Sequence, residues 1–345
     1  MRRNSFYMSA VAVCLLLLAA FASGTAARAT RENFADKGRA VVTAEQTIAA
    51  EATVTLLTCV ETGDVVVRGW DRKEVRARSN NAARIELRRA DATTDPNPAT
   101  RVEVLVARDE TEPARPGLCS NSGNLQLDVP RGATVQIKGN TGDVNVAGVA
   151  NVRAKNLSGD IELQQITKSV EAWSANGTII MRNSRGRARL ETISSEIVVS
   201  DVATGEAGDE LVVKSVSGEI SLEKLAHTHV EATSTNSSIG YAGALVEGGL
   251  YIFKSHSGSV TLTLPPDSAF QLNAKVHHGG EIVTDFPIRQ VPLVASTDPR
   301  NPSPVGGALL NDGRLTGVTG KADKRAATLV LSSFSGTLHL QRQAP

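Results

Sequence analysis

A short pattern of polar and apolar positions recurs along the chain about every 20 residues. Each copy has a small polar residue, usually followed by glycine, then any residue, an apolar residue, any residue and a second apolar residue. The copies begin at Thr62-Gly63, Ser122-Gly123, Thr141-Gly142, Ser158-Gly159, Asn176-Gly177, Ser194-Ser195, Ser217-Gly218, Asn236-Ser237, Ser257-Gly258, Gly279-Gly280 and Ser335-Gly336. A repeat of this length predicts a stack of similar structural units.

The apolar positions of the motif are almost never polar. The first is occupied by Val65, Leu125, Val144, Ile161, Ile179, Ile197, Ile220, Ile239, Val260, Ile282 and Leu338. The second is polar only at Thr284, and a further alternating stretch, such as Val152 with Ala154, precedes most turns. Alternation with a period of two is typical of strands with one buried face, so each unit is predicted to be strand, turn, strand.

A fixed period with the same residue type at the same phase indicates that equivalent positions stack on one another, which a series of independent hairpins does not require. We therefore predict an all-β fold, a single-stranded β-helix or β-solenoid with coils of about 20 residues. At about 4.8 Å per coil, the stack would form a rod of roughly 45–50 Å with apolar rows along its axis.

The glycines of the repeat are interpreted as structural turn residues. They are Gly63, Gly123, Gly142, Gly159, Gly177, Gly218, Gly258, Gly280 and Gly336. Glycine tolerates a positive φ at a tight corner, and the Ser, Thr or Asn before it can hydrogen-bond the bent backbone. Ser195 and Ser237 replace glycine in two copies, which leaves the type of turn open there.

Two proline-containing stretches, residues 92–117 and 286–312, interrupt the period. Both are interpreted as loop excursions from the stack, and such loops often carry the binding residues of a solenoid. A smaller insertion runs from Thr204 to Asp209. With these loops included, residues 30–345 are predicted to form one solenoid domain.

The first 29 residues have the layout of a secretory signal peptide. Arg2 and Arg3 precede an apolar run from Val11 to Ala20, and small residues follow. The run is about half the roughly 20 residues that a membrane span needs, so no transmembrane anchor is expected after cleavage. Residues 1–29 therefore predict export, to the periplasm or to the cell surface or extracellular space.

Two cysteines, Cys59 and Cys119, remain after removal of the signal peptide, because Cys14 lies within it. An even number of cysteines in an exported chain predicts a disulfide. That bond would close a long loop and stabilise the fold by roughly 4 kcal/mol. The alternative is a pair of buried free thiols, since two sulfurs alone do not make a structural zinc site.

The overall charge and composition narrow the choice of partners and of fold class. Lys and Arg total 37 against 36 Asp and Glu, so the summed charge gives no reason to expect nucleic acid, anionic lipid or an acidic polymer as a partner. Aromatic residues make up only 3% of the chain. Abundant Val, Ile, Leu, Thr and Ser fit stacked strands better than a helical core.

The segment Thr62–Asp71 resembles the opening of the bacterial putative adhesin family, a domain of unknown function. Further positions of the chain also resemble this family: Val75, Ser158-Gly159, Ser217-Gly218, Arg314–Gly320 and Ser335–Leu338. The resemblance covers most of residues 50–342, although Ser195 and Ser237 depart from the family's usual glycine. It implies an exported, non-enzymatic, right-handed β-solenoid with an adhesin-like role.

Carboxylates recur directly after the turns, at Asp64, Asp143, Asp160, Glu196, Glu219 and Glu281. Such a row could hold Ca²⁺. However, Thr178, Ser238 and Ser259 interrupt the row, and the glycine-rich nonapeptide of calcium-binding β-rolls is missing. We expect a solvated acidic edge.

Two pairs of histidines are candidate metal ligands. His227 and His229 could share a strand face, and His277 and His278 adjoin a turn. Neither pair has further ligands at suitable spacing. We therefore expect no metal and no cofactor.

Motifs for enzymatic chemistry are missing from the sequence, which contains no nucleophile elbow, zinc-binding helix, P-loop or dinucleotide fingerprint. A carbohydrate-active β-helix enzyme is the remaining catalytic alternative, and it would need two carboxylates across a groove and aromatic platforms. Trp70 and Trp173 are far apart in sequence, and Trp70 is interpreted as a packing residue over an open end of the solenoid. We expect no catalytic residues.

These observations predict a non-catalytic, adhesin-like protein of the cell envelope. It would present a long face of stacked strands to an envelope protein or a surface glycan, and not to nucleic acid. A structural element that self-associates end to end by strand addition is the second hypothesis. The carbohydrate-active enzyme is the third.

Overall fold

The computed structural model describes residues 44–80, 84–91, 97–107, 119, 121–289, 313–320 and 325–344. The chain divides into two units, Met1–Ala40 and Val41–Pro345, and every described residue belongs to the second unit. Residues 1–29, for which a signal peptide is predicted, lie outside the described part. Within that part the regular structure consists of strands β1 to β26, and no helix there is long and apolar enough to span a bilayer.

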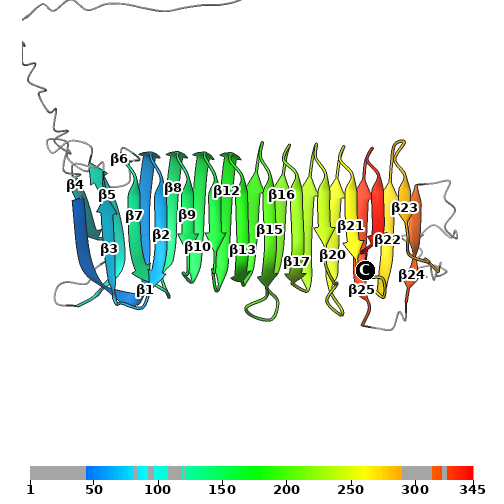
Figure 1. Ribbon diagram of the computed structural model, residues 1–345, viewed down its shortest axis with the longest axis horizontal. Helices are drawn as coiled ribbons and strands as arrows, with labels where there is room; N and C mark the ends of the chain where they lie inside the picture. The colour runs from blue at the N-terminus through cyan, green and yellow to red at the C-terminus, as the bar shows by residue number, and fades with distance from the viewer. Residues whose placement is uncertain are drawn as a thin grey trace, which may run out of the picture. The chain divides into compact units, whose positions relative to one another are not determined.

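Each central coil contributes one strand to each of two parallel sheets, called A and B (Figure 1). In one coil, β10 (Asn151–Ser158) lies in sheet B, the chain turns at Gly159, and β11 (Ile161–Gln164) lies in sheet A. The same course is followed by β8 (Thr134–Thr141) and β9 (Val144–Ala147), β12 (Ser169–Asn176) and β13 (Ile179–Arg185), β14 (Arg187–Thr192) and β15 (Ile197–Ala203), β16 (Glu210–Ser215) and β17 (Ile220–Ala226), β18 (His229–Ser234) and β19 (Ile239–Ala242), and β20 (Leu250–Ser255) and β21 (Val260–Leu264). The predicted coil and the predicted β-solenoid are confirmed.

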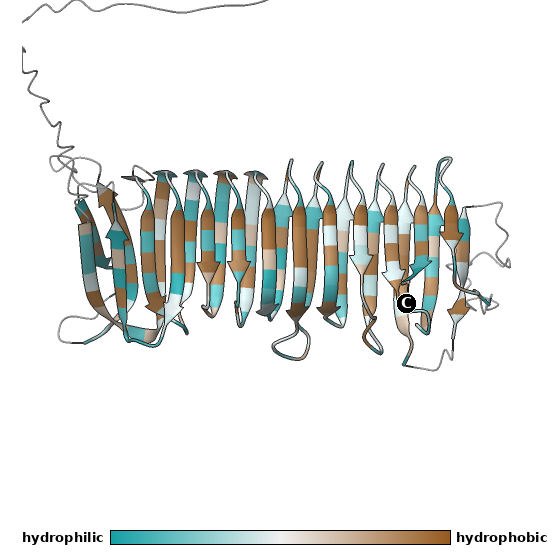
Figure 2. Cartoon of the chain, viewed as in Figure 1, coloured by the Kyte–Doolittle hydropathy of each residue, from teal (hydrophilic) through white to brown (hydrophobic). Residues whose placement is uncertain are grey.

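Equivalent positions of successive coils are aligned, and their side chains form buried columns between the two sheets. In sheet A, Ile161 pairs with Ile179 and Ile179 with Ile197, and all three are fully buried. In sheet B, Val152 pairs with Val170. Figure 2 shows the resulting alternation of hydrophobic and hydrophilic bands along the strands. Because a slip of one residue would turn every buried side chain outward, these columns fix the register.

The coils at both ends of the stack do not follow chain order. In sheet A, β2 (Val65–Trp70) lies between β7 (Leu125–Pro130) and β9. Likewise, β26 (Leu338–Arg342) lies between β21 and β23 (Ile282–Thr284). The apolar phase determines which face a coil buries but not which coil it stacks on, so the repeat alone does not predict this order.

Sheet B shows the same rearrangement. The second half of β1 (Ala44–Thr62) lies between β5 (Ala99–Ala107) and β8, and β25 (Ala327–Ser333) lies between β20 and β22 (Phe270–Val276). The short strand β6 (Asn121–Ser122) also pairs with β1. Each terminal segment of the solenoid is thus held between two other coils.

Antiparallel strands lie at both ends of the stack. At one end β3 (Glu74–Ser79) runs antiparallel to β7, and β4 (Arg84–Arg89) runs antiparallel to β5. At the other end β24 (Arg314–Thr319) runs antiparallel to β22. The exposed Arg84 and Arg88 on β4 are the kind of charged side chain that discourages strand addition at a sheet edge.

The interpretation of residues 92–117 as a loop excursion is wrong for their central part. Residues 99–107 form β5, which pairs with β1 and buries Val102, Val104 and Val106. These valines alternate as in other strands, but no glycine turn precedes them and prolines flank them on both sides. The remainder of that stretch, and residues 290–312 of the second excursion, lie outside the described residues apart from 97 and 98.

A row of polar side chains lies inside the solenoid, three residues before the turn position. In four coils a buried serine accepts a hydrogen bond from the backbone N–H at the turn, at 2.7–3.0 Å: Ser215 from Gly218, Ser234 from Ser237, Ser255 from Gly258 and Ser333 from Gly336. Ser237 makes this bond although it replaces glycine, so the coil continues there unchanged. The repeated serine was a signal that the sequence analysis did not use.

The turn glycines are required by close packing of the coils more than by a positive φ. Gly63 and Gly142 do adopt positive φ, at 127° and 123°. Gly218 does not, yet a Cβ there would lie 1.6 Å from the carbonyl oxygen of Ser195 in the neighbouring coil. The expected reason, conformational freedom, therefore applies to only part of the set. The absence of a side chain lets the turns stack.

Substituting Gly218 by alanine is expected to destabilise the fold by about 3 kcal/mol, because backbone atoms of the next coil must move to admit the Cβ. Gly240→Ala is the matched control, since a Cβ at Gly240 meets nothing closer than 3.8 Å. Denaturant unfolding followed by circular dichroism measures both variants. Equal stabilities of the two variants would contradict the packing explanation.

Candidate functional site on the outer face of sheet B

Outward side chains of sheet B are aligned in rows that cross successive coils. In one such row, residues from β8, β10, β12, β14 and β16 are direct partners in the order Gln136, Arg153, Glu171, Arg189 and Val212. Neighbouring strands lie about 4.8 Å apart, so long side chains in one row can reach each other. The surface of this face is therefore built from side chains that are distant in sequence.

A hollow of about 400 Å³ lies over these strands. Arg153 Nε donates to Glu171 Oε2 at 2.7 Å, and Ser169 Oγ donates to Asn151 Oδ1 at 2.8 Å, so much of its lining is held by mutual hydrogen bonds. Arg187 also lines the hollow, is exposed, and takes part in no ion pair within the described part of the chain. Its guanidinium is available to a ligand.

A second hollow, of about 430 Å³, adjoins the first, because Gln136 and Arg153 line both. It lies over β5, β1, β8 and β10, strands that are brought together by the rearranged coil order. Together the two hollows are lined by six basic side chains and three acidic ones, an excess of three positive charges on a chain whose net charge is +1. The basic residues are Arg101, Lys138, Arg153, Lys155, Arg187 and Arg189.

The chemistry of these hollows suits an anionic ligand with a flat apolar surface. Arginine presents a planar fork of donors that matches carboxylate, phosphate or sulfate groups. Trp173 lies outward on β12, two residues beyond Glu171 and beside Lys155, and is half-buried. An indole at such a position can stack on a sugar ring. The sequence analysis did not find this site, because the near-zero net charge hides an uneven distribution of charge between faces.

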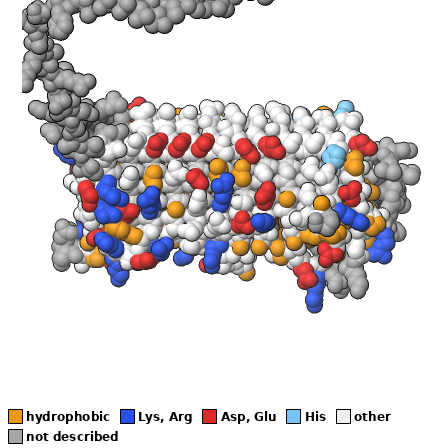
Figure 3. Space-filling model, in the orientation of Figure 1, with side chains coloured by type: hydrophobic (Ala, Val, Ile, Leu, Met, Phe, Trp, Pro, Cys, Tyr) orange, Lys and Arg blue, Asp and Glu red, His pale blue; other side chains and the backbone are white. Residues whose placement is uncertain are grey.

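The acidic row predicted after the turns lies along one edge of sheet A (Figure 3). Its carboxylates connect neighbouring coils: Asp64 accepts from the N–H of Asp143 at 3.0 Å, and Asp143 accepts from the N–H of Asp160 at 2.9 Å. Asp160 in turn accepts from the N–H of Thr178 at 2.8 Å. The exposed acidic edge that we expected is present, and its aspartates have a structural role.

The candidate histidine pairs are not arranged as the sequence suggested. His227 is fully buried, and its Nε2 lies 2.9 Å from the carbonyl oxygen of Gly186, whereas His229 is half-exposed on β18. The two do not share a face. Among the described residues no group of three or more His, Cys, Asp or Glu side chains could hold a metal ion.

The second pair, His277 and His278, packs against an aromatic side chain. Phe334 is exposed, and its ring stacks on those of His256 and His278 with centroids 4.7 and 4.8 Å apart. His277 lies further away, at 6.0 Å. These imidazoles therefore form part of an aromatic stack at the turn edge of the coils.

Trp70 is a packing residue, but it does not cover an open end of the solenoid. Its strand, β2, lies between two other coils. The indole N–H donates to the carbonyl oxygen of Glu74 at 2.9 Å, and the guanidinium of Arg76 stands 4.8 Å from the ring centroid. The ring therefore supports the bend between β2 and β3.

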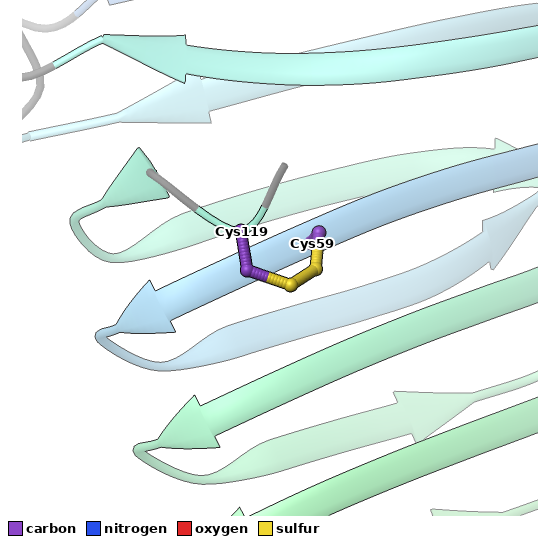
Figure 4. The surroundings of a disulfide bond; sticks show 2 residues. All are labelled: Cys59 and Cys119. Atoms are coloured by element: carbon purple, nitrogen blue, oxygen red, sulfur yellow. A yellow bond between two sulfur atoms is a disulfide. The ribbon is translucent and has the colours of Figure 1, made fainter. Parts of the chain in front are cut away.

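Cys59 in β1 is bonded to Cys119, which confirms the predicted disulfide (Figure 4). The two residues are 60 positions apart in sequence, and their Cα atoms are 4.8 Å apart. Cys59 also lines the second hollow. The bond thus fixes Cys119 beside that hollow.

Comparison with known proteins agrees with this architecture, which defines the chain as an all-β solenoid. Residues 120–286 match the family described as Toastrack DUF4097, a domain of unknown function. This match over residues 120–286 bears out the family resemblance predicted from the turn motifs. The chain is also similar to a crystal structure of a putative cell adhesion protein from Clostridium sporogenes, with 9% identity and a TM-score of 0.24, over 87% of this chain and 100% of that one. No curated protein matches the chain.

Removal of the disulfide, in the double variant Cys59→Ser and Cys119→Ser, is expected to lower the free energy of unfolding by about 4 kcal/mol, because a long loop is no longer closed in the unfolded state. Thermal or denaturant unfolding measures the loss. Reductant should produce the same loss in the unchanged protein and none in the double variant. An unchanged stability of the double variant would contradict the expectation.

The free energy of unfolding is expected to decrease as the pH is lowered, because of His227. Burial lowers its pKa, an effect only partly opposed by the hydrogen bond to Gly186 and by nearby Asp209. The neutral form is favoured in the folded state, so this contribution is complete above the unfolded pKa of about 6.5 and is lost as the pH falls toward the lowered folded pKa.

His227→Gln tests this point, because the amide can still donate to the Gly186 carbonyl but does not titrate. Between pH 8 and pH 5 the variant should lose less unfolding free energy than the unchanged protein, by on the order of 1 kcal/mol. His229→Gln, at a half-exposed position, is the control. Parallel stability profiles for His227→Gln and the unchanged protein would contradict the account.

Proposed function

We propose that this protein is an exported, non-catalytic binding protein of the cell envelope that holds an anionic surface glycan on the outer face of sheet B. The observation that carries the proposal is the pair of adjoining hollows with six basic side chains and three acidic ones. Because the lining side chains recur from coil to coil about every 4.8 Å, the face suits an extended polymer with repeated charges better than a small compact ligand.

The residues around the first hollow support binding in preference to catalysis. Glycosidases use two carboxylates that act independently across a groove. Two carboxylates, Glu171 and Glu210, line this hollow, and Glu171 is held by Arg153 at 2.7 Å, which suits a role in positioning the guanidinium. The carbohydrate-active enzyme remains the catalytic alternative, and release of sugars from a panel of polysaccharides would favour it.

Export is supported by the signal-like residues 1–29 and by the disulfide. Structural disulfides persist in oxidising compartments such as the periplasm and the cell surface. The bond between Cys59 and Cys119 therefore fits a mature protein that acts outside the cytoplasm. A surface glycan is a partner that such a compartment offers.

End-to-end polymerisation, the second hypothesis, gains no support from the ends of the stack. The outer strands β4 and β24 run antiparallel to their neighbours, and β4 carries exposed arginines. On sheet B a further coil would have to pair with strands that interrupt the parallel pattern, whereas on sheet A the outer strand β23 runs parallel to β26. The function proposed above requires no such polymer.

The double variant Arg187→Gln and Arg189→Gln is expected to weaken binding to a uronic-acid polysaccharide by about tenfold or more, because two charge-assisted contacts are lost. Titration calorimetry with alginate as the probe measures the affinity, and added salt should weaken binding of the unchanged protein.

The control is Arg182→Gln with Arg185→Gln, which removes the same number of exposed arginines from β13 in sheet A. This variant should bind like the unchanged protein. An equal loss in both variants would show that only overall charge matters, and the absence of any anionic-glycan binding would remove the proposal.

A further inference from the structure

Exposed apolar side chains gather at one phase of the coil. Leu157, Ile193, Val216 and Phe334 are 40–48% exposed and account for four of the five large exposed hydrophobic residues in the described ranges, the fifth being Val283. Each of the four comes directly before the small polar residue of its turn. We call this row the apolar crest.

Backbone hydrogen bonds show that the crest positions of successive coils lie side by side. The N–H of Val216 donates to the carbonyl oxygen of Thr192, and the N–H of Ser217 donates to that of Ile193, so Val216 lies beside Ile193 in the next coil. The same pattern places Phe334 beside His256. The crest therefore runs along the turn edge of the solenoid, with smaller or polar residues between its large members.

Opposite charges flank the crest on its two sides. On the sheet B side, two residues before the crest position, stand Lys138, Lys155, Lys214, Lys254 and Lys275. On the sheet A side, directly after the turn, stand Asp143, Asp160, Glu196, Glu219 and Glu281. In the coil of Gly218 all three elements are exposed: Lys214, Val216 and Glu219. Neither Lys214 nor Glu219 has an ion pair within the described part of the chain.

We propose that a second copy of this chain covers the turn edge, with the two solenoids side by side and parallel. A two-fold axis along the solenoid axis would place the sheet B side of one copy against the sheet A side of the other. In the coils that carry both charges, the basic flank then meets the acidic flank of the partner, and the two crests are enclosed between them. These coils are those of Lys138 and Asp143, Lys155 and Asp160, Lys214 and Glu219, and Lys275 and Glu281. Lys214 of each copy faces Glu219 of the other.

The charges beside the crest favour a parallel pair over an antiparallel pair or an anionic bilayer. An antiparallel pair would place lysines against lysines and carboxylates against carboxylates, which costs affinity. An anionic bilayer would attract one flank and repel the other. Other coils lack one or both charges, as at Thr178, Ser238 and Ser259. The coil with Glu191 and Glu196 has a carboxylate on both sides, but Glu191 is already paired with Arg189 at 3.3 Å.

The size of the edge and the charge of the chain are compatible with a stable pair. Roughly eight coils at about 4.8 Å and an edge about 20 Å wide give about 770 Å² per copy, near the ~800 Å² per partner of a standard interface. The net charge of +1 produces little general repulsion between copies. The pairing goes beyond the proposed glycan binding, because the crest and the acidic flank line neither hollow, although Lys138 and Lys155 of the basic flank also line the second hollow.

Sedimentation equilibrium of the purified full chain tests the pairing. The unchanged protein should show a concentration-dependent mass that reaches twice that of one chain. Lys214→Glu or Glu219→Lys alone should weaken dimerisation by about tenfold, and the two together should restore it. Val216→Glu should abolish the dimer, whereas Val283→Glu, at an exposed position away from the crest, should retain it.

Single cysteines at two turns distinguish the orientations. Ser158→Cys and Ser257→Cys should each form a disulfide-linked dimer with itself in a parallel pair, whereas in an antiparallel pair the two variants would link only to each other. A strictly monomeric protein at high concentration would overturn the proposal, as would antiparallel linkage. The proposal would also be overturned if the protein stayed monomeric and bound through the crest to vesicles of phosphatidylglycerol and phosphatidylethanolamine. If such a monomer still bound the glycan, the proposed function would remain supported although the pairing would not.

Discussion

Close stacking of equivalent backbone positions is the constraint on which this structure depends. Successive turns approach so closely that a Cβ at Gly218 would lie 1.6 Å from the carbonyl oxygen of Ser195. This approach allows the columns of Ile161, Ile179 and Ile197 to fill the space between the sheets without gaps. The buried serines and the aspartate row then satisfy the backbone amides that the turns leave unpaired.

The same stacking builds the surface as rows, and this explains how a nearly neutral chain acquires faces of different character. A residue type repeated at one phase becomes a stripe many coils long. Basic residues on sheet B produce the two hollows, carboxylates after the turn produce the acidic edge of sheet A, and apolar residues before the turn produce the crest. Binding to a linear polymer and pairing of two copies both use such stripes, and the two surfaces share Lys138 and Lys155.

The sequence was sufficient to predict the coil, the buried columns and the turn glycines, because each recurs at a constant phase of the repeat. The disulfide was predicted from the even number of cysteines that remain after the signal peptide. It was not sufficient for the coil order: β2 and β26 have the same apolar pattern as the coils that they separate. It also missed β5, which lacks the turn motif. The candidate site depends on which strands become neighbours, as β5 and β8 do on either side of β1, and net charge cannot reveal that.

The most direct test of this account is disulfide trapping of the rearranged coils. Val66 and Asn145 are direct partners in β2 and β9, whereas Gln126 is separated from Asn145 by β2. The account predicts efficient cross-linking of the pair Val66→Cys and Asn145→Cys, and little cross-linking of Gln126→Cys with Asn145→Cys. The reverse result would show that coils stack in chain order, and the second hollow on sheet B would not exist as described.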